Sequence, residues 1–149
     1  MSKISNDRDF RAKTESLGHA QQRALAASFI RNVLTFSDDG RVSRAVKVAA
    51  DMNASNDELA SALRSATAAA LDSHARCGAD CNWGDQAGYF VARAAMAALS
   101  PAGQASGSPA WQAAMSSRMA RTCMSIDSSE DASGEEQLAQ YRVLDEYTN

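Results

Sequence analysis

Proline and aromatic residues are scarce in this chain of 149 residues, and each shortage narrows the possible folds. Only 2 prolines occur, Pro101 and Pro109, so long stretches contain no residue that would interrupt a helix. Aromatic residues make up 6% of the chain, and alanine is prominent among the 45% of residues that are hydrophobic. Because sheets favour β-branched and aromatic residues, this composition favours an all-α fold.

The chain also lacks a basic surplus and long apolar runs. It has 15 Lys and Arg against 18 Asp and Glu, a net charge of −3, which provides no broad basic face for a nucleic-acid backbone. No stretch approaches the roughly 20 apolar residues of a membrane helix, and the first residues lack the apolar core of a signal peptide. We therefore expect a cytosolic protein that binds neither nucleic acid nor membrane. Its 3 cysteines, an odd number, are expected to be reduced thiols.

Helical periodicity dominates the first third of the chain. Residues 7 to 36 have helix-forming composition with apolar side chains on one face, and Gly18 is expected to divide them into a short helix and a longer one. The segment ending at Gly40 is interpreted as a helix stop. Apolar residues then recur at helical spacing over 42 to 52, which predicts another helix.

Two alanine-rich segments follow. Ser55 and Glu58 have the spacing of a capping box, in which each side chain bonds the backbone N–H of the other residue, and they predict the start of a long helix. Residues 83 to 99 predict a further helix that ends before Pro101. Small side chains let helix backbones approach closely, so we expect these two helices to pack as an antiparallel pair.

The composition changes at residues 101 to 109, which are rich in proline, glycine and serine and are interpreted as an internal linker. Residues 110 to 149 are expected to form C-terminal helices that pack back on the bundle, with Ser133 and Glu136 as a second capping box. The apolar residues predicted to make this contact are Trp111, Met115 and Met119. Residues 1 to 149 are therefore predicted to form a single compact helical domain of five or six helices.

One histidine and two cysteines suggest a metal or redox site. His74, Cys77 and Cys81 are spaced three and four residues apart, which places them within an arc of about 60° on one helix face. Imidazole and thiolate groups suit zinc, but a structural zinc site uses four ligands, and folding would have to supply the fourth from Cys123. A redox-active thiol is the other chemistry that these residues permit.

The preferred interpretation of the same residues is structural. Leu63, Ala66 and Ala70 fall on the stripe that carries His74, so we expect that stripe to be buried, with cysteine acting as a small hydrophobic residue. This interpretation requires no cofactor. Zinc remains the alternative.

Charged residues of the two alanine-rich segments are candidates for ion pairs. Arg76 and Arg93 could pair with Asp72, Asp80 or Asp85. Pairs of this kind fix the register of neighbouring helices more often than they perform chemistry. We predict no catalytic residues, in these segments or elsewhere in the chain.

Three aromatic residues are candidate anchors for a protein partner. Trp83, Tyr89 and Trp111 carry much of the large aromatic surface, and protein interfaces are enriched in such side chains. Placement in the core is the competing interpretation of each.

The order of these segments resembles the alanine-rich, all-helical immunity proteins of bacterial polymorphic toxin systems. The resemblance covers about residues 21 to 100, and the residues that match are Arg41 and Arg44 in the second helix, followed by His74 and Arg93 among the alanines. It implies a protein without catalytic activity that binds and neutralises a cognate toxin. The acidic surplus would suit a basic toxin.

Three functions therefore stand as hypotheses. The first is a non-catalytic cytosolic protein-binding module, as the resemblance implies. The second is a small metal-binding or thiol-redox protein that uses His74, Cys77 and Cys81. The third is a structural subunit that assembles through its alanine-rich helices, and the oligomeric state is left open.

Overall fold

A computed structural model describes residues 3–76, 82–101, 108–125 and 132–148. These residues form seven α-helices and one short 3-10 helix, without a strand among them, which confirms the predicted all-α fold. The number of α-helices in the described parts is seven, whereas five or six were predicted. They are α1 (Asp7–Glu15), α2 (His19–Arg31), η1 (Leu34–Phe36), α3 (Gly40–Ala50), α4 (Asn56–Arg76), α5 (Trp83–Ala98), α6 (Pro109–Met124) and α7 (Ala132–Thr148).

Polar side chains fix where the helices begin. The predicted capping box of α4 is confirmed: the Ser55 N–H donates to Glu58 Oε1 at 3.1 Å, and the Glu58 N–H donates to Ser55 Oγ at 3.1 Å. Asn6 caps α1 by accepting from the Asp9 N–H at 2.8 Å. The break at Gly18 is also confirmed, since α1 ends at Glu15 and α2 begins just after the glycine.

Two predicted helix boundaries were wrong. Gly40 is the first residue of α3 and not a stop, because Asp39 caps this helix by accepting from the Arg41 N–H at 2.9 Å. Ser133 lies inside α7, which begins at Ala132, so it cannot serve as the residue before that helix. Glu136 is fully buried and pairs with another helix instead.

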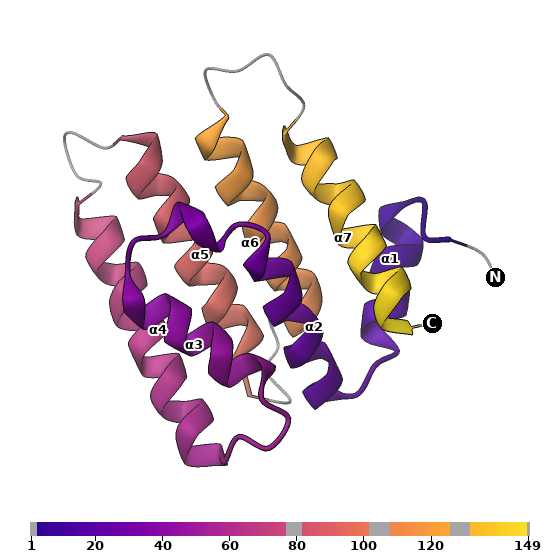
Figure 1. The fold of residues 1–149 in the computed structure, drawn as a ribbon, viewed down its shortest axis with the longest axis horizontal. Coiled ribbons are helices and arrows are strands. Elements are labelled where there is room, and N and C mark those ends of the chain that lie inside the picture. The colour runs from indigo at the N-terminus through magenta and orange to yellow at the C-terminus, as the bar shows by residue number, and fades with distance from the viewer. Residues whose placement is uncertain (1–2, 77–81, 102–107, 126–131, 149) are drawn as a thin grey trace.

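The bundle is built around α5. Figure 1 shows α4, α5 and α6 side by side, with α2 and α3 lying across one face of this row. Helix α5 contacts α2, α3, α4 and α6, and small side chains allow this close packing. The buried alanines of α5 are Ala87, Ala92, Ala94, Ala95 and Ala98.

A second apolar cluster joins α1 and α7 to the rest of the bundle. Phe10 and Phe29 are fully buried and pack with their ring centroids 5.6 Å apart and their planes tilted by 41°, and Leu144 lies in the same cluster. Burying a side chain of this size contributes about 1.5–3 kcal/mol. Trp111 and Met115 of α6 pack against this cluster as predicted.

Other parts of the predicted C-terminal segment differ from expectation. Met119 is 46% exposed and does not serve the packing role expected of it; α6 buries smaller residues such as Ala113, Ser117 and Ala120 instead. Of the predicted linker, residues 102–107 lie outside the described residues, and Pro109 is the first residue of α6. In the described parts of the chain, no helix is both long and apolar enough to cross a membrane.

Candidate functional site

A polar cleft of about 610 Å³ opens at one end of the bundle. Its walls are η1 and the segment that leads into α3 on one side, and the end of α4 with the start of α5 on the other. Of the twelve lining residues in the described parts of the chain, three are aspartates and one is an arginine, so this lining is anionic. The charged lining residues are Asp38, Asp39, Asp85 and Arg76.

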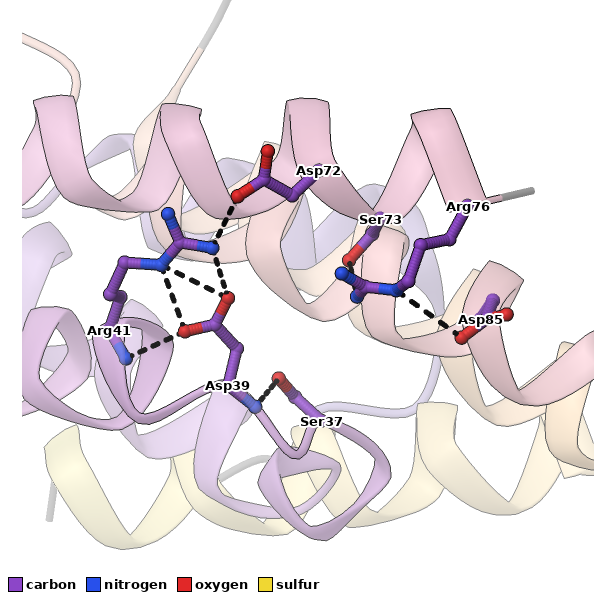
Figure 2. A network of polar contacts seen from close by, with 7 residues as sticks. All are labelled: Ser37, Asp39, Arg41, Asp72, Ser73, Arg76 and Asp85. Atoms are coloured by element: carbon purple, nitrogen blue, oxygen red, sulfur yellow. Dashed lines mark hydrogen bonds and ion pairs between the residues drawn. The ribbon is translucent and has the colours of Figure 1, made fainter. Parts of the chain in front are cut away.

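Arg41 organises one wall of the cleft. Its Nη2 lies 2.6 Å from Asp39 Oδ2 and 2.7 Å from Asp72 Oδ2, and its Nε donates to Asp39 Oδ1 at 3.0 Å. Figure 2 shows the guanidinium between the two carboxylates. Because Asp39 caps α3 and Asp72 belongs to α4, this network ties the start of α3 to the side of α4.

The network favours the charged forms of Asp39 and Arg41. Hydrogen bonding from Arg41 lowers the pKa of Asp39 below its usual value of 3.8. The same contact, followed by the one with Asp72, raises the pKa of Arg41 further above its usual value. Asp39 is therefore an anion at neutral pH, suited to accepting hydrogen bonds from a cation and unsuited to donating a proton.

The opposite wall is held by Arg76 at the end of α4. Its Nε lies 3.8 Å from Asp85 Oδ1, and its Nη2 donates to the buried Ser73 Oγ at 3.1 Å. Asp85 is itself positioned by Asn82, which caps α5 and accepts from the Asp85 N–H at 2.8 Å. The contacts of Arg76 with Ser73 and Asp85, drawn in Figure 2, fix the start of α5 against the end of α4.

The predicted ion pairs are found in part. Arg76 pairs with Asp85 as expected, whereas Asp72 pairs with Arg41 from a different helix. The Arg93 guanidinium contacts Tyr89, lying 5.8 Å from the centre of its ring. Asp80 lies outside the described residues.

The metal and redox candidates are only partly described. His74 is exposed, which corrects the prediction of a buried stripe that included it; the buried positions of α4 are Ala62, Ala66, Ala69, Ala70 and Ser73. Its ring lies 5.4 Å from the ring of Tyr89. Cys77 and Cys81 lie outside the described residues.

Cys123, the possible fourth ligand, is buried on α6, and burial raises the pKa of its thiol. A raised thiol pKa disfavours the thiolate form that binds metal. Among the residues described here, no group of three or more His, Cys, Asp or Glu side chains could hold a metal ion.

The three aromatic candidates occupy different surroundings. Trp83, the first residue of α5, is 48% exposed and lies between two residues that line the cleft. Tyr89 is half-buried against His74. Trp111 belongs to the second apolar cluster, with its ring centroid 6.0 Å from that of Phe10. The structure therefore does not bring the three together.

Arg44 and Arg93, two of the residues on which the resemblance rests, do not line the anionic cleft. Arg44 is exposed and lines a groove between α3 and α4, where Arg41 also contributes. Arg93 is exposed on α5. Of the four matching residues, only Arg41 belongs to the polar network of the cleft.

Sequence reasoning missed the segment from Ser37 to Asp39. The sequence pattern assigns Asp38 and Asp39 to a helix stop, although an aspartate directly before a helix start is a favoured N-cap. Reading Asp39 as the cap of the helix that follows would have placed these carboxylates at a helix start. The start of α3 lies across the cleft from Arg76 because of tertiary packing, which no local sequence pattern predicts.

Comparison of the chain with known protein families, curated proteins and solved structures found no match.

Proposed function

We propose that this chain is a non-catalytic protein-binding module that receives a basic segment of its partner in the anionic cleft. In the form implied by the resemblance, it is an immunity protein that acts in the bacterial cytosol and neutralises a basic toxin. The observation that carries the proposal is the combination of an anionic cleft with exposed apolar side chains beside it.

The charges of the cleft favour a cationic partner. Asp38 is exposed, and no ion pair involving it is present among the described residues. Asp39 and Asp85 present further carboxylates that are already fixed by neighbouring residues. Preorganised charges of this kind steer an oppositely charged partner and fix its orientation.

Apolar side chains beside the cleft could supply affinity. Met124 lines the cleft and is 47% exposed, and Trp83 at the start of α5 is 48% exposed. Methionine and aromatic side chains are enriched in the centres of protein interfaces. A partner segment that combines basic and apolar residues therefore fits both features.

A rigid scaffold would support this role. We assign it to the alanine-rich helices α4 and α5, which contact each other and would act as an antiparallel pair. The ion pair between Arg76 and Asp85 joins the two helices where they form the cleft wall. A wall fixed in this way loses little conformational entropy when the partner binds.

The test is native mass spectrometry of the protein purified without chelator from the cells that make it. We expect a stoichiometric complex with one basic protein. The identified partner is then titrated against Asp38→Lys and against Glu146→Lys, which makes the same charge change on an exposed residue of α7. We expect Asp38→Lys to weaken binding at least tenfold and Glu146→Lys to leave it unchanged. Equal affinities would contradict the proposal.

A further inference from the structure

A second cleft, of about 510 Å³, lies at the other end of the long helix α4. It is formed by the start of α2, the first two turns of α4 and the end of α5. The nearest lining residues of the two clefts on α4 are Arg64 and Ser73, which are nine positions and about 14 Å apart along the helix. This cleft therefore has no residue in common with the anionic one.

The chemistry of the second cleft is the reverse of the first. Leucines supply its apolar walls, and the ionisable residues among its described lining are all basic. No carboxylate occurs in that described lining, although acidic residues outnumber basic ones in the whole chain. The leucines are Leu59, Leu63 and Leu99, and the basic residues are His19, Arg23 and Arg64.

Arg23 is the most informative of these residues because it is only 6% exposed. Its Nε donates to the carbonyl oxygen of Ala49 at 3.0 Å and its Nη2 to that of Asp51 at 2.9 Å. Among the ion pairs of the described residues, none involves Arg23. Carbonyl groups offset a buried positive charge only in part, so an anion in the cleft would stabilise it further.

Two helix starts add to the positive potential. His19 is the first residue of α2 and Asn56 is the first residue of α4, and both line the cleft. Helix N-termini carry partial positive charge and exposed N–H donors. The acidic residues of the first turn of α4, Asp57 and Glu58, line the separate groove between α3 and α4.

We propose that this cleft binds a small amphiphilic anion, an aliphatic carboxylate. Its chain lies against Leu59, Leu63 and Leu99, and its carboxylate faces Arg23 and Arg64. The volume falls within the range of roughly 300–1,000 Å³ found for small-molecule sites, which are mostly apolar with a few polar groups. This inference does not depend on the proposed partner of the anionic cleft.

The probe is decanoate, titrated into the full chain by isothermal titration calorimetry below its micelle concentration. We expect one site per chain, and at least tenfold weaker binding of decanol and of decyltrimethylammonium, which keep the chain but lack the negative charge. Amide chemical shifts should change around residues 19–23 and 59–64. Decanol binding as tightly as decanoate, or shift changes confined to the anionic cleft, would overturn the proposal.

The matched variants are Arg64→Gln and Arg31→Gln. Both arginines are exposed and each substitution removes one positive charge, but only Arg64 lines the cleft. Arg23 is unsuitable because it also holds the end of α3. We expect Arg64→Gln to weaken decanoate binding about tenfold while Arg31→Gln binds as the wild type does. Equal affinities of the two variants would overturn the proposal.

Discussion

Arg118 is a buried cation on which three helices converge. Its side chain donates to both carboxylate oxygens of Asp7 at 2.9 Å and to Gln140 Oε1 at 2.8 Å. The Tyr141 hydroxyl donates to the same aspartate at 2.8 Å. These contacts, led by the hydrogen bond from Arg118, lower the pKa of Asp7 to about 2. The ion pair between Arg118 and Asp7, with its hydrogen bonds to Gln140 and Tyr141, therefore joins α1, α6 and α7 in addition to their apolar packing.

Asp7→Asn should destabilise the protein by about 1–2 kcal/mol at pH 7, because Arg118 loses its carboxylate partner. The estimate is modest because the Asp7 side chain is 39% exposed and solvent screens the pair. Since folding lowers the pKa of Asp7, its contribution is present above pH 3.8 and is lost as the pH falls through 2. Urea unfolding of wild type and variant should therefore show a smaller difference at pH 3 than at pH 7. The exposed Glu146→Gln serves as control, and a difference that does not change with pH would contradict this account.

Glu136 should change the stability of the protein with pH in the opposite direction to Asp7. It is fully buried, and burial raises the pKa of its carboxyl above 4.5 even though Arg121 acts to lower it. A carboxyl with a raised pKa favours folding below pH 4.5, and this contribution is lost as the pH rises through the folded-state pKa. Glu136→Gln should therefore gain stability relative to wild type between pH 4 and pH 7, measured by urea unfolding. The exposed neighbour Glu135→Gln should show no such trend; a relative loss by Glu136→Gln would refute the assignment.

At the scale of single elements, the start of α4 offers the cleanest test. Ser55→Ala removes the side-chain acceptor of the capping box and should cost about 1 kcal/mol of stability. Ser61→Ala, an exposed position inside the same helix, should stabilise it by about 0.5 kcal/mol or less, since alanine is the better helix former. Urea unfolding measures both changes. Two effects of the same sign would show that the cap does not act as described.

The helices themselves were predictable because their signals are local. Ser55 and Glu58 mark a start within four residues, and Gly18 marks a break between two helices of helix-forming composition. Gly40 was misassigned because glycine occurs at both ends of helices, and only the bond from the Arg41 N–H to Asp39 distinguishes them here. Local sequence patterns were thus enough to predict most of the helices but not all of the residues at which they begin or end.

The face that each helix buries was harder to predict. His74 was placed on a buried stripe with Ala66 and Ala70; the structure buries these two alanines but leaves His74 exposed, and Ser73 is buried beside it. Small side chains are buried there because neighbouring helices approach closely along that row. Periodicity finds an apolar stripe, but in an alanine-rich helix several stripes are nearly equivalent.

At the scale of the whole molecule, the candidate site depends on contacts between distant segments. Arg41 and Asp72 are separated by 31 positions, and no local pattern pairs them. Asp85 was one of three aspartates predicted as possible partners of Arg76, and it is the one that pairs with this arginine. The sequence therefore indicated one wall of the anionic cleft, and the tertiary fold supplied the other.

Hydrogen–deuterium exchange on the complex with the native partner tests the central claim most directly. If the anionic cleft is the binding site, protection should appear in residues 35–41, 72–76 and 82–88, which form its two walls. The start of α2 and the end of α7 should exchange as they do in the isolated protein. Protection confined to those two regions, with the cleft unchanged, would contradict the account.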